Sequence, residues 1–261
     1  MNERQKKILE YWAAWIYEQQ EDEKEMADYI VRQLGKRPLR VFEAACGGGK
    51  LCVPLALAGH DVTGIDRDEN MLRHIALKAK ELNNLHILRG DMLSCPWGQD
   101  FDAVILGANL LNNIVTDRDC KRAQKNLLER TWDALKIGGK LLIDFDCPLD
   151  IETWIPANKE WVCFEGCDDH GTLGRYIVIN GTTNNRTRIV NGGRRWEITP
   201  KEGESFIFTE NSHTYFPTLE QVCAWLYRVG FLVESINGGY AGEAFDERHR
   251  RAVIWARKIT P

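Results

Sequence analysis

Apolar and polar residues follow a regular alternation between residues 39 and 146 of the chain. The short apolar runs LRVFEA, HDVTGID, LHILRGD, FDAVILG and KLLIDFD predict strands, and the longer amphipathic stretches between them predict helices. An alternation of this kind is typical of a parallel sheet covered by helices on both faces. Such sheets bind ligands at the carboxyl ends of their strands.

Capping residues predict where several helices begin and end. Asp68 is placed to cap the helix over DENMLRHIALKAKEL, and Thr218 with Gln221 forms a capping box that opens TLEQVCAWLYRVG. The pair Gly138-Gly139 is expected to stop the long helix RDCKRAQKNLLERTWDALK. A further helical pattern covers residues 3–34.

The alternation is interrupted over residues 150–212, where the pattern becomes that of antiparallel strands. GRYIVING and RTRIVNGGRRWEI predict two of these strands, with turn signals at Asn184-Asn185 and at Asn191-Gly192-Gly193. The runs FLVESI and AVIWARK then predict two closing strands. An insertion of this length is too long for a bare connection, and we expect it to form a lid.

These patterns predict an α/β fold with a mostly parallel, seven-stranded sheet and helices on both faces. We expect a core over residues 1–149 and 213–261, including a capping helix at its N-terminus. The antiparallel β insertion over residues 150–212 would form the substrate lid.

Composition and charge narrow the classes of function. The chain has 261 residues, 44% of them hydrophobic and 28% charged, with a formal net charge of −4 and no basic stripe, so nucleic acid is not an expected partner. No run of 18 apolar residues predicts a membrane span, and eight scattered cysteines favour reduced thiols in a cytoplasm. Cys163, Cys167 and His170 lack an obvious fourth ligand, so we expect no metal site.

The stretch VFEAACGGGK predicts a strand that runs into a glycine-rich turn. A phosphate-binding P-loop is excluded because Lys50 is followed by Leu51, which has no hydroxyl group. A dinucleotide fingerprint needs a third glycine where this chain has Cys52. Asp66 could nevertheless bind a ribose, so a nicotinamide-dependent oxidoreductase stays open as an alternative.

Three carboxylates lie at the ends of three predicted strands or directly after them, at the same sheet edge. Glu43, Asp66 and Asp91 would repel a pyrophosphate, because like charges disfavour one another. They suit a ligand that combines a cation, a ribose and an adenine without phosphate. S-adenosylmethionine is such a ligand.

The ordered motifs VFEAACGGG, VTGIDRDENML, LRGDM, FDAVILGANLL and LKIGGKLLIDF resemble those of the class I S-adenosylmethionine-dependent methyltransferases. The resemblance covers residues 39–146, and the closing strands over 231–257 are consistent with it. It implies a Rossmann-like methyltransferase fold and S-adenosylmethionine as cofactor. Ala45 departs from the family pattern, which usually has glycine at this position.

The resemblance also implies roles for individual residues in binding the cofactor. Glu43 would hold the methionine amino group, and the backbone at Ala45, Gly47 and Gly49 would approach the methionyl part closely. Tyr11 lies in the segment that folds over the cofactor in small-molecule members. Asp66 and Met71 are expected at the ribose, and Asp91 and Met92 at the adenine. The residues expected to border the transferable methyl group are Leu106, Gly107 and Asn109.

The methyl acceptor is expected to be a small polar metabolite, methylated on nitrogen or oxygen. The layout is loosely similar to that of glycine N-methyltransferase and related small-molecule enzymes. His213 and Tyr215 are candidate catalytic residues, since a histidine can take a proton near neutral pH. We expect a monomer or homodimer, and a non-catalytic S-adenosylmethionine-binding module remains the second alternative. The candidate substrate-binding residues in the insertion are Trp154, Arg175, Tyr176 and Trp196.

Overall fold

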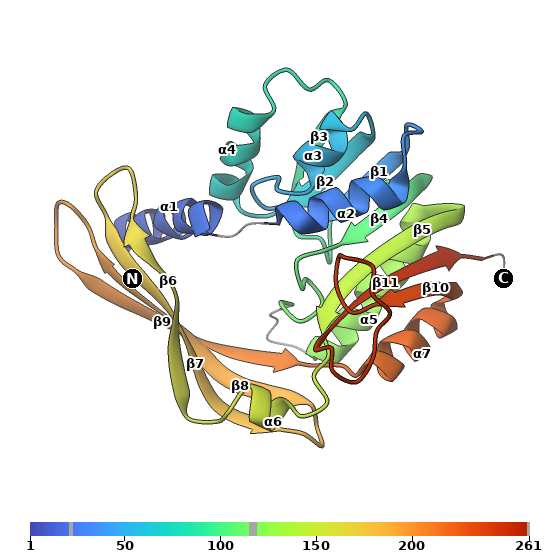
Figure 1. Ribbon diagram of the computed structural model, residues 1–261. Helices are drawn as coiled ribbons and strands as arrows, with labels where there is room; N and C mark the ends of the chain where they lie inside the picture. The colour runs from blue at the N-terminus through green and yellow to red at the C-terminus, as the bar shows by residue number, and fades with distance from the viewer. Residues whose placement is uncertain (21–22, 115–118, 260–261) are drawn as a thin grey trace. The chain divides into compact units, whose positions relative to one another are not determined.

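The computed structural model describes residues 1–20, 23–114 and 119–259, and the chain divides into two compact units. We call the unit of residues 22–149 and 216–261 the parallel-sheet unit, and the unit of residues 1–21 and 150–215 the antiparallel-sheet unit. Figure 1 traces the chain through both.

The parallel-sheet unit contains the seven-stranded sheet that the sequence predicts, in the order β10-β11-β5-β4-β1-β2-β3. Only β11 runs antiparallel to its neighbours, β5 and β10. The strand order reverses between β1 and β4, and this is where ligands bind in open α/β sheets. Its strands are β1 (Arg40–Ala44), β2 (Asp61–Asp66), β3 (Leu85–Arg89), β4 (Phe101–Leu106), β5 (Leu135–Asp146), β10 (Phe231–Asn237) and β11 (Arg251–Lys258).

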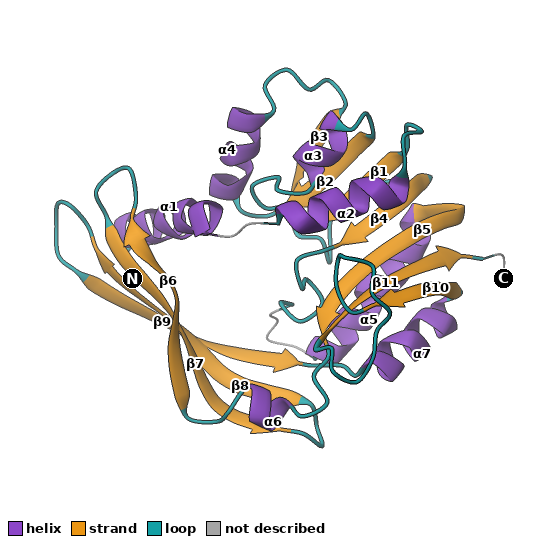
Figure 2. Cartoon of the chain, in the orientation of Figure 1, coloured by secondary structure: helices purple, strands orange, loops and turns teal. Residues whose placement is uncertain are grey.

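Helices cover both faces of this sheet (Figure 2). Residues of α2, α3 and α4 share one buried apolar cluster with the central strands, whereas α5 and α7 pack against each other. These helices bury apolar residues from the strands, which are apolar on both faces as expected for parallel strands. The helices are α2 (Lys24–Leu34), α3 (Cys52–Leu57), α4 (Glu69–Lys78), α5 (Cys120–Ala134) and α7 (Leu219–Val229).

Two of the three predicted helix ends are confirmed. The Asp68 carboxylate caps α4 by accepting from the Asn70 amide at 2.9 Å, and Thr218 and Gln221 form the capping box of α7. The prediction for α5 is wrong, because the helix ends at Ala134 and Gly138-Gly139 lie inside β5.

The early end of α5 has a tertiary cause. Leu135 is already extended and pairs with Phe101 of β4, where the register of the two strands shifts. A Cβ atom on Gly139 would lie 2.9 Å from the Lys136 carbonyl oxygen, so the glycine permits this irregular pairing. Arg118, the first residue of the helix expected there, lies outside the described residues.

The antiparallel-sheet unit combines one long helix with a four-stranded sheet in the order β6-β7-β8-β9. The helical pattern expected over residues 3–34 is divided into α1, in this unit, and α2; residues 21–22 lie outside the described residues. The elements of the unit are α1 (Glu3–Gln20), α6 (Ile151–Trp154), β6 (Lys159–Cys167), β7 (Leu173–Asn184), β8 (Ile189–Thr199) and β9 (Phe206–Tyr215).

One of the two turns predicted for this sheet is confirmed. The chain turns over residues 185–188, where the Asn184 side chain accepts from the Thr187 amide at 2.8 Å. The turn predicted at residues 191–193 is wrong, because these residues lie within β8. A Cβ atom on Gly192 would lie 2.0 Å from the Ile179 carbonyl oxygen, so glycine serves close strand approach beside a register shift.

Helix α1 packs on one face of the antiparallel sheet. Phe164, Tyr176, Trp196 and Phe208 stack in succession across the strands and pack against the buried side chain of Trp12. The sequence-based division placed residues 1–21 with the core. They group instead with the insertion, because the apolar side of α1 is buried against these aromatic rings.

Candidate cofactor site

The glycine turn after β1 adopts a backbone that ordinary side chains rarely tolerate. Ala45, Gly47 and Gly49 have φ angles of 54°, 52° and 83°, all in the left-handed region. A left-handed φ favours glycine, so Ala45 carries a local conformational cost at this position. A Cβ atom on Gly47 would lie 3.0 Å from the Met71 side chain, which brings the ribose candidate Met71 against the turn.

Asp66, at the end of β2, fixes this turn. One carboxylate oxygen accepts from the Gly47 amide at 2.9 Å and the other accepts from the Asp68 amide at 2.8 Å. Burial raises the pKa of Asp66, and these two hydrogen bonds partly offset that effect. Two ionised oxygens offer about four acceptor positions. Positions therefore remain for the hydroxyl groups of a bound ribose.

Glu43 lies on β1 between two strands and is only 4% exposed. Its Oε2 atom has no hydrogen-bond partner among the described residues. Burial raises the pKa of Glu43 well above its ordinary value, and the neighbouring Cys52 adds to this. A buried acceptor without a partner costs about 1–3 kcal/mol, so the site favours a ligand that donates to this oxygen.

Asp91 and Met92 follow β3 at the same edge of the sheet. The Asp91 carboxylate accepts from the Leu93 amide at 2.7 Å, and the Met92 carbonyl accepts from the Trp97 indole at 2.9 Å. Because β1, β2 and β3 are adjacent and parallel, Glu43, Asp66 and Asp91 end at one edge, as the sequence predicts.

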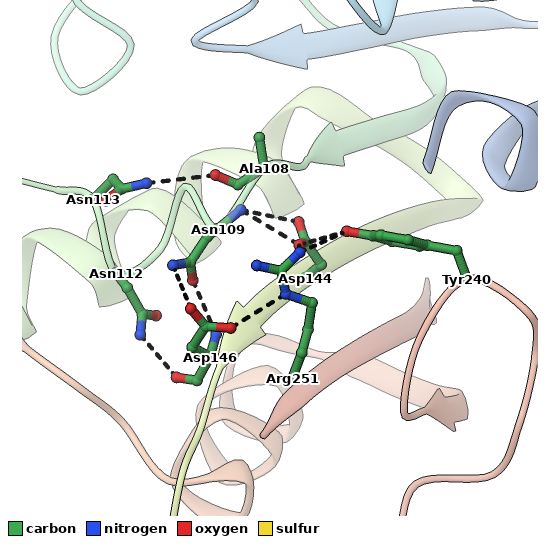
Figure 3. Close-up of polar contacts among 8 residues, drawn as sticks. All are labelled: Ala108, Asn109, Asn112, Asn113, Asp144, Asp146, Tyr240 and Arg251. Atoms are coloured by element: carbon green, nitrogen blue, oxygen red, sulfur yellow. Dashed lines mark hydrogen bonds and ion pairs between the residues drawn. The ribbon is translucent and has the colours of Figure 1, made fainter. Parts of the chain in front are cut away.

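The end of β4 brings the three methyl-bordering candidates into one turn. Leu106 is buried, and a Cβ atom on Gly107 would lie 2.7 Å from the Leu51 side chain. Asn109 has a φ angle of 57° and donates from its side chain to Asp146 at 2.8 Å (Figure 3).

A polar network that the sequence patterns do not predict lies behind this turn. Asp144 and Asp146 point from β5 toward Asn109, Arg251 lies at the start of β11, and Tyr240 comes from the β10–β11 connection (Figure 3). Tyr240 donates to Asp144 at 2.8 Å, and Arg251 lies 3.2 Å from Asp146. The two aspartates of LIDFD are the sequence feature that could have indicated this network, because two charges at the end of one strand need partners.

The substrate candidates of the antiparallel-sheet unit lie on both faces of the sheet. Tyr176 and Trp196 stack on the face that α1 covers, whereas Arg175 pairs with Glu165 and Glu197 on the opposite face. The structure therefore does not bring Arg175 together with the two aromatic rings. Trp154 ends α6.

The remaining candidates also belong to this unit. His213, on β9, is exposed and lies 2.6 Å from the Asn191 side chain, and Tyr215 is buried at the end of the same strand. Tyr11 donates to Asp169 at 2.8 Å and stacks on His170. Across the described residues no group of three acidic, histidine or cysteine side chains could hold a metal ion. Nor does any described helix have the length and apolarity needed to cross a membrane.

Comparisons with known proteins agree with this geometry. Residues 41–139 match the family model described as a methyltransferase domain. YqeM of Bacillus subtilis (strain 168), whose methyltransferase name is provisional, is 29% identical over 56% of this chain and 63% of its own length. The similarly named protein GWCH70_2453 of Geobacillus sp. (strain WCH70) is 24% identical over 87% of this chain and 88% of its own length.

Solved structures show the same fold. The sugar N-methyltransferase KedS8 from Streptoalloteichus sp. ATCC 53650 superposes with a TM-score of 0.67 at 17% identity, covering 92% of this chain and 89% of that chain. Its likeness supports the arrangement of strands and helices described above. The matched region includes the glycine turn, Asp66 and Asp91, and residues 41–139 are therefore similar to a methyltransferase domain.

Proposed function

We propose that this chain transfers the methyl group of S-adenosylmethionine to a nitrogen or oxygen atom of a small polar metabolite. The observation that supports this best is the buried Glu43 carboxyl group, with one oxygen lacking a partner beside the glycine turn. An ammonium group such as that of the methionyl part would supply the missing donor and the opposite charge. When bound, S-adenosylmethionine supplies an electrophilic methyl group, so the protein needs chiefly to bind and orient.

The remaining residues of the site fit the rest of this cofactor. Asp66 has acceptor capacity for two ribose hydroxyl groups, and its bond to the Gly47 amide keeps the turn close to the methionyl part. Asp91 and Met92 would contact the adenine amino group and ring. Leu106, Gly107 and Asn109 would border the methyl group.

For the acceptor, we propose Tyr176 and Trp196 as binding residues through the part of their stacked, half-buried rings that α1 leaves exposed, since aromatic surfaces suit a small molecule. Nitrogen is favoured as the methylated atom, since KedS8 is described as a sugar N-methyltransferase. Arg175 would have to contact the acceptor on a different surface from Tyr176 and Trp196, because it lies on the other face of the sheet. We also propose Trp154 as a substrate-binding residue and His213 and Tyr215 as catalytic residues. His213 would act as the base when the acceptor atom carries a proton that must be removed.

Calorimetry with S-adenosylhomocysteine tests the cofactor site. We expect wild-type protein to bind it in the micromolar range and Asp66→Ala to lose at least about tenfold in affinity, since a charged acceptor and the tie to Gly47 disappear together. Asp61→Ala is the matched control, because Asp61 begins the same strand and pairs with exposed His86 instead. Equal binding by both variants would contradict the proposed site.

A screen with isotopically labelled S-adenosylmethionine and a panel of amines, amino sugars and hydroxylated metabolites then tests the acceptor class. Label transfer to an amine or hydroxyl group is the expected outcome. If the protein labels only a protein or nucleic acid, the small-molecule proposal is wrong.

A further inference from the structure

The turn after β4 has an unusual backbone for its sequence. Ala108 and Asn109 are consecutive non-glycine residues with φ angles of 54° and 57°. Each residue held in this region costs of the order of 1 kcal/mol unless its surroundings compensate, and asparagine tolerates it better than alanine. Contacts made by the turn must therefore stabilise it.

Asn109 supplies most of those contacts. Its side-chain amide donates to Asp146 at 2.8 Å, and its side-chain oxygen accepts from the Asp146 backbone amide at 2.9 Å. Its own backbone amide is directed at both oxygens of Asp144, at 3.3 and 3.4 Å. The turn is thus bound to two positions of β5.

Asp144 can accept from the Asn109 amide as a carboxylate only because other residues stabilise its charge. It is completely buried, and an isolated carboxylate there would be strongly disfavoured. Tyr240 donates to Asp144 at 2.8 Å and Arg251 lies 3.7 Å away, while Arg251 also pairs with Asp146 (Figure 3). The Tyr240 ring packs beside Tyr29 of α2, and Arg251 donates to the Tyr240 hydroxyl group at 3.4 Å.

We propose that Tyr240 is a positioning residue: through Asp144 it holds the Ala108–Asn109 turn in its left-handed conformation and so shapes the cofactor site around the transferable methyl group. This inference rests on the proposed function, in which Asn109 borders that methyl group. Tyr240 itself does not contact the reacting atoms. Its effect should appear on ligands that carry the methyl group rather than on the adenosine part.

The test compares the affinities of S-adenosylmethionine and S-adenosylhomocysteine for Tyr240→Phe, which keeps the ring and removes only the hydroxyl group. We expect S-adenosylmethionine to bind about five- to tenfold more weakly and S-adenosylhomocysteine to change less than about twofold, since one hydrogen bond to a charged group is lost. Hydrogen exchange at the Asn109 amide should accelerate in the same variant without ligand.

Tyr29→Phe is the control, because it removes a neighbouring buried hydroxyl group that contacts Asn237 and Trp255 instead. Asn109→Gly is a second variant: glycine accepts the left-handed backbone but leaves Asp146 without its amide partner, and the same selective loss is expected. Equal weakening of both ligands, or unchanged exchange at Asn109, would overturn the inference. If wild-type protein binds neither ligand, the proposed function fails instead, while the exchange measurement still tests the turn.

Discussion

At the scale of single residues, Glu43 is an acidic side chain on β1, where its neighbours along the strand, Phe42 and Ala44, are buried and apolar. Its neighbours across the sheet are Gly64 and Ile105, and its Oε2 atom lacks a partner among the described residues. Because folding raises the pKa of Glu43, the folded protein keeps the proton of this carboxyl group at pH values where the unfolded chain has already released it. Stability from this group is therefore fully present below about pH 4.5, the ordinary range of a glutamate, and is lost as pH rises through the folded-state pKa.

We therefore expect Glu43→Gln to have opposite effects on stability and on binding. Glutamine removes the charge, so the free energy of unfolding near neutral pH should rise by about 1 kcal/mol or more, while affinity for S-adenosylhomocysteine falls about tenfold. Urea denaturation and calorimetry measure the two quantities. Glu25→Gln, at an exposed position of α2, is the control and should change neither.

The same shift predicts the pH dependence of binding. An ammonium ligand favours ionised Glu43, so below its raised pKa the carboxyl group must release a proton when the ligand binds. Affinity should therefore increase with pH and level off above that pKa. Titrations in buffers of different ionisation enthalpy measure the released proton, and a pH-independent affinity in wild type would show that Glu43 does not contact the ligand.

At the scale of elements, the attachment of α1 to the antiparallel sheet depends on a glycine. Trp12 lies directly over Gly174 of β7, where an added Cβ atom would lie 2.2 Å from the indole ring. The indole also donates to the Gly166 carbonyl at 3.1 Å. The missing side chain on β7 thus makes room for the indole ring of Trp12.

Gly174→Ala is expected to destabilise the antiparallel-sheet unit by about 1–3 kcal/mol, because the Trp12 ring must move away from the sheet. Urea denaturation followed by tryptophan fluorescence measures this. Leu173→Ala changes the adjacent, exposed residue and should have a much smaller effect. Equal destabilisation by the two substitutions would show that α1 is not held by this contact.

At the scale of the whole molecule, each of the two units is built from two separate segments of the chain. The antiparallel sheet lies between the two segments of the parallel-sheet unit in the sequence. The proposed cofactor residues belong to the parallel-sheet unit. A bound cofactor stabilises the structure that forms its site, by about 2.7 kcal/mol at a free concentration one hundred times Kd.

Hydrogen exchange with and without S-adenosylhomocysteine should therefore show protection first in β1, β2 and β4 of the parallel-sheet unit. We expect slower exchange in peptides covering residues 40–49, 61–71 and 101–109, because these end at the proposed site. A peptide that covers β3 and Asp91 tests the adenine position separately, because Asp91 is proposed to contact the adenine amino group. Protection confined to residues 159–199 would place the ligand on the antiparallel sheet and contradict the assignment.

Local signals made much of this structure predictable. The strands of the parallel sheet follow from apolar runs, and the caps at Asp68 and Thr218 depend on bonds within one helical turn. Glu43, Asp66 and Asp91 were found because parallel strands bring their ends to one edge. The network of Asp144, Tyr240 and Arg251 was not found, since its members come from distant segments and each alone has no recognisable motif.

The sequence by itself determined the class of fold, the motifs of the methyltransferase family and the carboxylates at the sheet edge, because these depend on periodicity and spacing along the chain. The tertiary structure decided what depends on partners far apart in sequence. Strand pairing ended α5 at Ala134, close strand approach gave Gly192 its role within β8, and aromatic burial joined α1 to the insertion. In each case the free energy that stabilises the observed structure comes from contacts between segments far apart in sequence, and a local pattern does not specify such contacts.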